Sequence, residues 1–198
     1  MAQYSLSLLK KAVASKNYRW FDDGKPFHLN IIGIRKNNPV PNKFDDYVTL
    51  SVFNGKEWVY MEWKATTDPG SYWLLNPGNV KGTAILKPGQ YVDCWQLGLH
   101  QGKYEALVQR KPVTVIRDNN KNNVLDFTTA SLDTGVFGIN IHRANEKTES
   151  IQVDKWSAGC QVIANPLSFD HLIFNVNESL RTGRANWFSY TLLTEEDL

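Results

Sequence analysis

The chain has 198 residues, a size typical of one domain that buries about 70% of its unfolded surface. Apolar residues make up 42% and charged residues 21%, which excludes an intrinsically disordered chain. The 22 basic and 20 acidic side chains leave a net charge of only +2, so we expect no nucleic-acid partner and no attraction to anionic lipid.

The first 27 residues predict a helical extension of a single domain that covers residues 1–198. Four apolar residues share one face at helical spacing: Leu6, Leu9, Ala12 and Val13. The lysines follow this apolar patch, which is the reverse of a secretory signal, and no apolar run approaches the roughly 20 residues of a membrane helix. We therefore expect synthesis in the cytoplasm without an export signal, and no membrane insertion.

The pattern then changes to strands. Residues 28–65 predict antiparallel sheet, with Asn54-Gly55 as a hairpin turn between alternating apolar residues. Three Pro-Gly turns predict that loops dominate residues 66–90. Further strands are expected at 90–100, 104–110, 112–118 and 135–143, followed by a helix over 166–180 and a last strand over 186–193. The fold class is therefore mainly β, with a helix at each end.

The expected strand 135–143 carries the first candidate for chemistry. Strand alternation places Asn140 and His142 on one face together with Gly138, which leaves room beside a polar pair. Such an arrangement is typical of the floor of a cleft. The alternatives are an edge histidine without function and an asparagine that serves only the sheet.

The segment 156–160, Trp-Ser-Ala-Gly-Cys, carries the second candidate. A turn of small residues can present the Cys160 thiol and direct backbone N–H groups at a developing oxyanion. The thiol would need a neighbouring imidazole as base, because a free thiol is ionised only to a few per cent at neutral pH. Trp156 is the aromatic residue best placed to line a cleft. The alternative is that Cys160 is a buried structural cysteine.

These residues together resemble the catalytic signature of the L,D-transpeptidase (YkuD-type) family. His142, fourteen intervening residues and Ser157-Ala158-Gly159-Cys160 are similar to the family's His…[Ser/Thr]-His-Gly-Cys pattern. Residues 87–91 resemble the Thr-Pro-x-Gly-x-Phe segment ahead of its active-site strands. The likeness covers about residues 28–165, and the run from 135 to 163 is also similar to uncharacterised phage and prophage proteins suspected of acting on peptidoglycan.

The resemblance implies an L,D-transpeptidase-like β-sandwich or barrel and a role for each matching residue. Cys160 would be the nucleophile that forms a thioester with a peptidoglycan stem peptide, and His142 the base. Ser157 and Gly159 match the turn whose backbone would form the oxyanion site. The family needs no metal and no organic cofactor. The acyl group of the thioester would then be transferred to water or to an amine.

The chain departs from the signature at two positions. The family's second histidine is Ala158, and the position two after the cysteine, usually Arg or Asn, is Val162. We expect His100 or Gln161 to supply a lost polar contact and Asn140 to help orient His142, although a main-chain carbonyl could serve as well. For His100 the alternative is a histidine in a surface turn.

Other residues favour structural roles. Cys94 has no small-residue turn around it and is expected in the core, and a disulfide with Cys160 is not expected. The spacing of His and Cys does not support zinc, and the polar run 118–126 lacks the central glycine of a calcium loop. Aromatic stacking on sugars is a further alternative for Trp63, Trp73 and Trp95.

The sequence thus predicts a cysteine peptidase or transpeptidase acting on stem peptides of the bacterial cell wall or periplasm. Hydrolysis is favoured over cross-linking, as in a phage endolysin or a virion-associated wall hydrolase. The rival hypothesis is a catalytically silent structural or wall-binding protein that has retained the fold. The sequence gives no oligomeric state.

Overall fold

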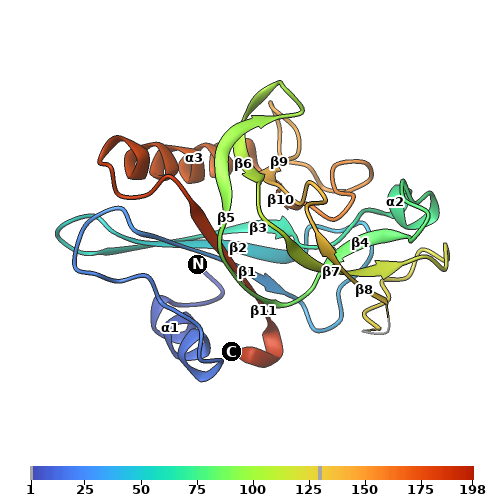
Figure 1. The fold of residues 1–198 in the computed structure, drawn as a ribbon, viewed down its shortest axis with the longest axis horizontal. Helices are drawn as coiled ribbons and strands as arrows, with labels where there is room; N and C mark the ends of the chain where they lie inside the picture. Colours follow the sequence, from blue (N-terminus) through green and yellow to red (C-terminus); the bar gives the residue numbers. More distant parts are fainter. Residues whose placement is uncertain (1, 129–130) are drawn as a thin grey trace.

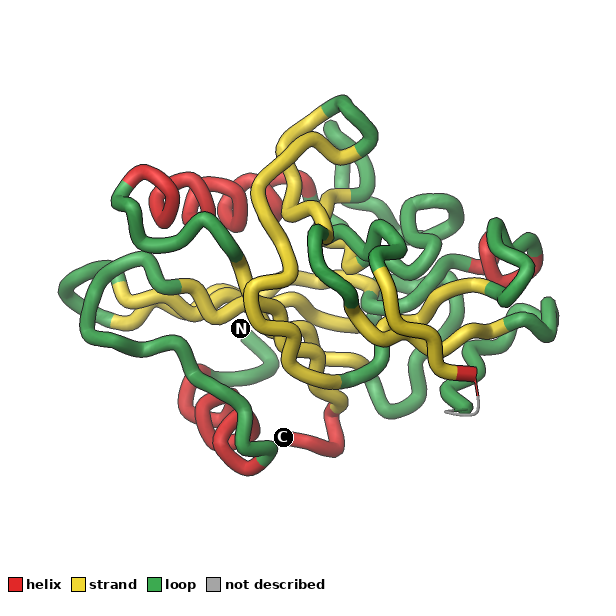
Figure 2. Tube along the Cα trace, viewed as in Figure 1, coloured by secondary structure: helices red, strands yellow, loops and turns green. Residues whose placement is uncertain are grey.

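A computed structural model describes residues 2–128 and 131–198. The strands are β1 (Leu29–Arg35), β2 (Asp46–Phe53), β3 (Trp58–Thr66), β4 (Thr83–Leu86), β5 (Gly89–His100), β6 (Tyr104–Gln109), β7 (Val113–Asp118), β8 (Leu132–Gly135), β9 (Ile141–Arg143), β10 (Gln161–Ile163) and β11 (Phe188–Thr194). The helices are α1 (Leu6–Ser15), α2 (Ser71–Leu75), α3 (Pro166–Arg181) and the short 3-10 helix η2 (Glu195–Asp197). Figures 1 and 2 show their arrangement.

Eight strands close a barrel in the order β1-β11-β5-β6-β9-β10-β3-β2, and β4-β7-β8 form a second, three-stranded sheet. The expected mainly-β fold with a helix near each end is confirmed. Most neighbouring strands are antiparallel, as alternating hairpins require, but β1 pairs with β11 in parallel and β9 pairs with β10 in parallel. Within the described residues, no helix has both the length and the apolar character needed to cross a bilayer.

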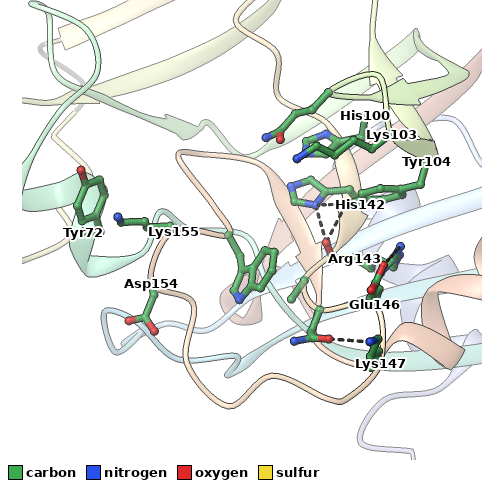
Figure 3. A pocket seen from close by; sticks show the side chains of 14 residues that line it. Tyr72, His100, Lys103, Tyr104, His142, Arg143, Glu146, Lys147, Asp154 and Lys155 are labelled. Carbon is green, nitrogen blue, oxygen red and sulfur yellow. Dashed lines mark hydrogen bonds and ion pairs between the residues drawn. The ribbon is translucent and has the colours of Figure 1, made fainter.

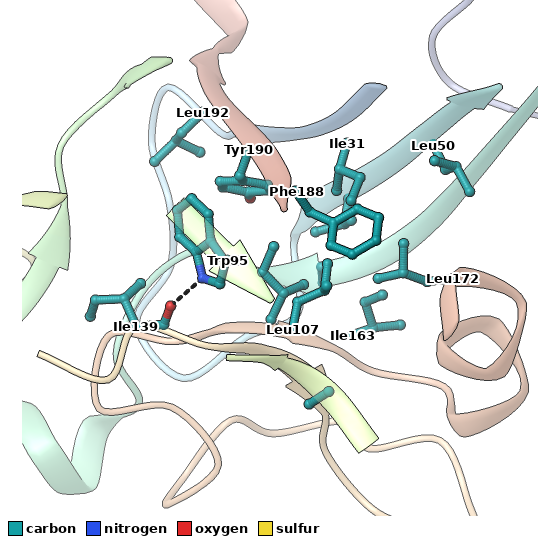
Figure 4. Close-up of a cluster of buried hydrophobic side chains, with 14 of the residues drawn as sticks. Ile31, Leu50, Trp95, Leu107, Ile139, Ile163, Leu172, Phe188, Tyr190 and Leu192 are labelled. Carbon is teal, nitrogen blue, oxygen red and sulfur yellow. Dashed lines mark hydrogen bonds between the residues drawn. The ribbon is translucent and has the colours of Figure 1, made fainter. Parts of the chain in front are cut away.

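The core fills the barrel (Figure 4). Trp95 is fully buried there, and its indole N–H donates to the carbonyl of Ile139 at 2.7 Å. Trp63 is also a core residue, and Cys94 is buried and free of any disulfide. These placements confirm the core assignment of Cys94 and show that the sugar-stacking alternative was wrong for Trp63 and Trp95.

The two helices near the ends cover different parts of the barrel. In α1, Leu9, Ala12 and Val13 are buried against the outer side of β1 and β11, as the amphipathic pattern predicts. Its N-cap is Ser5, whose side chain accepts the backbone N–H of Leu8. Helix α3 starts with Pro166 in its first turn and packs Phe169 and other apolar side chains into the main core.

The local structure departs from two expectations. Residues 66–90 contain the expected loops, but α2 and β4 lie among them. The expected strand 135–143 is interrupted between β8 and β9, because Gly138 adopts a positive φ of 77°. The backbone N–H groups of Phe137 and Ile139 donate to the side-chain oxygen of Gln109, at 3.1 and 2.8 Å, in place of a neighbouring strand.

Candidate active site

The parallel pair β9 and β10 brings His142 and Cys160 to the same face. Val162 pairs with His142 in this ladder, and paired residues of parallel strands point to the same side. Cys160 lies two residues before Val162 and packs beside it in an apolar cluster on the outside of the barrel. Gln161, between them, points into the barrel. The pairing therefore places the thiol one strand away from the imidazole.

His142 is held in one tautomer. Its side chain is buried, and its Nδ1 lies 2.7 Å from the carbonyl oxygen of Arg143, which can only accept a hydrogen bond. The hydroxyl of Tyr104 donates to the same carbonyl at 3.1 Å and lies 3.2 Å from Nδ1 (Figure 3). Nδ1 therefore carries the proton. The buried Nε2 has no hydrogen-bond partner within the described residues and is left with a free lone pair.

A cavity of about 1000 Å³ opens beside these rings. His142, His100 and Tyr104 contribute to its lining (Figure 3). Trp156 also lines it. The charged side chains that line the cavity are four cations and two acids, namely Lys103, Arg143, Lys147, Lys155, Glu146 and Asp154. The cavity is thus bordered by excess positive charge, which favours a ligand that carries carboxylates.

The turn that carries Cys160 is built by the two residues that match the family's turn. The Ser157 hydroxyl donates to the Cys160 carbonyl at 2.8 Å and accepts the Gly159 N–H at 3.1 Å, and its own carbonyl accepts the Gly70 N–H. Gly159 has φ +122°, and a Cβ atom there would lie 2.4 Å from the carbonyl oxygen of Ala84. Ser157 and Gly159 are both buried, so they shape the turn without lining the cavity.

This geometry gives a test with a matched control. Gly159→Ala should destabilise the fold by about 2–5 kcal/mol, because it adds backbone strain and a steric clash. Gly138→Ala has the same strain, since Gly138 also has a positive φ, but no atom of the described residues lies within 4 Å of its added Cβ. We expect this control to lose about 1 kcal/mol. Urea unfolding of both variants measures the difference, and equal losses would contradict the proposed clash.

The Cys160 thiol does not contact His142 in this arrangement. Cys160 is half-buried, and its Sγ donates to the Gly138 carbonyl at 3.3 Å. It lies two residues, roughly 6.6 Å, before the position opposite His142 along the strand. Burial raises the pKa of the thiol to about 11, although the nearby backbone N–H of Asn140 works in the other direction. Burial also lowers the pKa of His142, to about 3, and the neighbouring His100 adds to this effect.

These two pKa shifts predict a neutral resting pair in place of a thiolate and an imidazolium. The alkylation rate of Cys160 by iodoacetamide should then be low at pH 7 and rise about tenfold per pH unit up to about pH 10, because the thiolate is the reactive form. Peptide mapping by mass spectrometry separates Cys160 from Cys94. A rate that is already constant from pH 6 upward would instead show a preformed thiolate.

His100 packs against His142, and Asn140 contacts His100. His100 ends β5, is buried, and stacks on His142 with ring centroids 4.0 Å apart and an interplanar angle of 19°. The Asn140 Nδ2 lies 3.0 Å from the His100 Nδ1. The surface-turn alternative for His100 was therefore wrong. Asn140 contacts His100, whereas a main-chain carbonyl, that of Arg143, orients His142.

Of the two other residues expected at the site, Trp156 lines the cavity and Gln161 lies inside the barrel. Trp156 is 42% exposed and lines the cavity. Gln161 is fully buried, and its Oε1 accepts the Tyr190 hydroxyl at 2.9 Å inside the barrel. Gln161 therefore cannot line the cavity, and the expectation that it contacts substrate was wrong. It supports the turn from within, because its Nε2 donates to the Gly159 carbonyl.

Sequence reasoning missed two residues of the site. Tyr104 lines the cavity and bonds the carbonyl that orients His142, but in the sequence it is one aromatic residue of an ordinary strand. Tyr72 lies in α2, which was expected to be loop, and it lines the same cavity with 40% of its side chain exposed. The sequence does contain one indication of both residues, because each is an aromatic residue that closely follows a glycine in a turn, Gly70 for Tyr72 and Gly102 for Tyr104.

Comparison of the chain with protein-family models, with curated proteins and with solved structures finds no match. The likeness to the L,D-transpeptidase signature therefore rests on the residues themselves.

Proposed function

We propose that this protein is a cysteine-dependent peptidase or transpeptidase that acts on peptidoglycan stem peptides. One observation carries the proposal. A thiol and a buried imidazole with a free Nε2 lone pair lie on the same face of adjacent parallel strands, and the imidazole lines a cavity with a cationic border, whereas Cys160 is not among the residues that line it. Stem peptides carry free carboxylates, which such a border would attract.

The reaction needs the thiol to turn from the Gly138 carbonyl toward His142. As Sγ attacks the carbonyl carbon of the scissile peptide bond, the thiol proton passes to Nε2 of His142, and a tetrahedral oxyanion forms. Collapse of the oxyanion breaks the C–N bond, and His142 returns the proton to the leaving amine. The resulting thioester then passes its acyl group to water or to an amine.

The backbone of the turn can offer a donor to the oxyanion. Within the described part of the chain, the N–H of Cys160 has no hydrogen-bond partner, whereas the N–H of Gly159 is occupied by the Ser157 hydroxyl. The proposal therefore gives the role of donor to Cys160 N–H and gives Gly159 only the role of shaping the turn. Tyr72 and Trp156 would border the substrate on the open side of the cavity.

We further propose that water is the acceptor, as in a phage endolysin or a virion-associated wall hydrolase. The support for this part is the likeness of residues 135–163 to phage and prophage proteins suspected of acting on peptidoglycan. Hydrolysis of the host wall is the reaction that such proteins would need.

One experiment tests the reaction class. Purified tetrapeptide and cross-linked muropeptides are incubated with the protein and with Cys160→Ala, and the masses of the products are measured by mass spectrometry. We expect a product from the intact protein alone, and its mass identifies the bond and the acceptor. Cys94→Ala is the control for loss of a thiol outside the site and should retain the activity. No product from the intact protein would contradict the proposal.

The second candidate is a catalytically silent wall-binding protein. The observations that favour it are the thiol bonded away from His142 and the alanine at position 158, where the signature has a histidine. Such a protein should bind insoluble peptidoglycan in a pelleting assay without releasing a product. Binding that survives Cys160→Ala, together with no turnover, would select this candidate.

A further inference from the structure

The two stacked imidazoles, His100 and His142, have different hydrogen-bond partners at the same ring atom. Both side chains are at least nine-tenths buried, and both line the cavity. Burial lowers the pKa of each ring below the usual histidine value, so each is neutral at pH 7. A neutral imidazole has one N–H donor and one bare nitrogen, and the partner at Nδ1 decides which is which.

His142 has an acceptor at Nδ1. The Arg143 carbonyl lies 2.7 Å away and cannot donate, so the proton is on Nδ1 and the bare nitrogen is Nε2. This is the tautomer that a base acting through Nε2 requires.

His100 has a donor at Nδ1. The side-chain oxygen of Asn140 accepts the backbone N–H of Gln109 at 2.9 Å, which fixes the orientation of the amide because a backbone N–H can only donate. The other end of the amide, Nδ2, therefore faces the His100 Nδ1 at 3.0 Å and donates to it. The His100 proton is then on Nε2. Within the described residues, this N–H has no protein acceptor.

We propose that the stacked pair is locked in opposite tautomers, with His142 as the base and the His100 Nε2–H as a hydrogen-bond donor to the acyl oxygen of the substrate. The assignment rests on the proposed function. It gives His100 the place of a catalytic residue, and Asn140 the place of the positioning residue that sets its tautomer. The turn leaves the Cys160 N–H as its backbone donor, because the Gly159 N–H is occupied by the Ser157 hydroxyl, and His100 would supply a second donor from a side chain.

The tautomers can be measured without substrate. In a ¹⁵N-labelled protein, long-range ¹H–¹⁵N correlation spectra report which ring nitrogen of each histidine carries the proton. The chain has four histidines, and the signals of the pair are assigned by their loss in His100→Gln and His142→Gln. We expect Nδ1–H for His142 and Nε2–H for His100 at pH 7. An Nδ1–H signal for His100 would overturn the proposal.

Asn140→Asp tests the link between tautomer and rate. The carboxylate keeps the acceptor for the Gln109 N–H but replaces the donor to His100 with an acceptor, so the His100 proton should move to Nδ1. The rate of thioester formation with a tetrapeptide muropeptide, followed by intact-protein mass, should then fall by about 10²-fold. An unchanged rate together with a moved proton would overturn the role of His100.

Variants of His100 itself separate donation from packing. His100→Phe keeps a stacked ring without a donor and should also lose about 10²–10³-fold in thioester formation. His100→Gln offers an amide N–H and should retain more of the rate. Alkylation of Cys160 by iodoacetamide develops no oxyanion, so its pH profile should be the same in His100→Phe as in the native chain. A parallel loss of alkylation would show that His100 acts on the thiol or on the fold instead.

The two proposals fail in different ways. If the native protein forms no thioester and no product with any muropeptide, the proposed function fails, and the catalytic role of His100 fails with it. If the native protein reacts and His100→Phe reacts equally fast, only the role of His100 is overturned.

Discussion

His142→Gln should lower the rate of product formation from a muropeptide by about 10²–10⁴-fold, the range that a positioned general base contributes. The variant removes the free Nε2 lone pair while leaving a side chain of similar size in the buried position. His171→Gln is the matched control, because His171 is exposed on α3 and should leave the rate unchanged. An unchanged rate in His142→Gln would assign the base to another residue.

The pH dependence of the native reaction follows from the same burial. A base works only when it is deprotonated, and burial with the nearby His100 lowers the pKa of His142 to about 3. The kcat/KM profile reports the free protein, so its acid limb should lie below pH 5. Activity is then retained as the pH falls to about 5. An acid limb near 6.5, the usual histidine value, would show that the acting base is not this buried imidazole.

Arg35→Met should destabilise the protein by about 3–5 kcal/mol, because it leaves buried carboxylates without their cation. Arg35 lies 2.8 Å from Asp68 Oδ1, and its guanidinium also donates to the hydroxyl and the carbonyl of Thr67 and to the carbonyl of Leu86. The Nε–H of Arg35 is directed at the Thr67 hydroxyl, and within the described residues the Asp68 carboxylate has no hydrogen-bond partner, so Arg35 mainly compensates its charge. Asp46, also fully buried, accepts the Thr67 N–H.

The deficit of Arg35→Met should grow with pH. Burial raises the pKa of Asp68, and Arg35 opposes that rise. An acid with a raised pKa binds a proton in the folded protein at pH values where the unfolded chain has released it, so stability falls as the pH rises above about 4. Without Arg35 the pKa rises further, and this loss extends to higher pH. The free energy of unfolding in urea should therefore differ more from the native value at pH 8 than at pH 5.

A surface ion pair provides the control for this variant. Arg181 pairs with Glu178 on α3, and the arginine side chain is 68% exposed. Arg181→Met should cost less than 1 kcal/mol and show little dependence on pH over the same range, because solvent screens such a pair. Equal losses for the two variants would show that the buried ion pair contributes no more than an exposed one.

Local signals in the sequence predicted most of the elements. The Asn54-Gly55 turn predicted the β2–β3 hairpin, and Pro166 with helical spacing after it predicted α3. In residues 57–63, alternation puts aromatic side chains on both faces of the strand, a pattern typical of a sheet that is covered on both sides. In the structure, Trp63 packs into the main core and Tyr60 packs with the cluster under α1.

Partner choice and backbone breaks could not be predicted in the same way. Alternation of apolar residues does not indicate which strand lies beside a given strand in the sheet, so the parallel pairing of β9 with β10 was not predicted. Nor does it reveal that the Gln109 side chain replaces a strand partner beside Gly138. This break decides the site, because it leaves the Gly138 carbonyl free to bind the Cys160 thiol.

Contacts between distant segments set the rest of the site. Asn140 and His142 were expected on one face, and both contact His100 from β5. Alternation could also have indicated that Gln161 points away from its neighbours Cys160 and Val162, but the fully closed barrel is what buries it. The orienting carbonyl of Arg143 has no signal in a sequence, because every residue carries one.

The parallel pairing of β1 with β11 has a consequence for how the chain reaches its fold. β11 lies between β1 and β5, and its residues Tyr190 to Thr194 pair with Ile31 to Arg35, near the other end of the sequence. Contacts between such distant segments slow folding, since the long intervening chain must be ordered first. A ribosome-bound chain that lacks β11 cannot close the barrel. We therefore expect a late, slow folding step, during which the unpaired edges of β1 and β5 are available for aggregation.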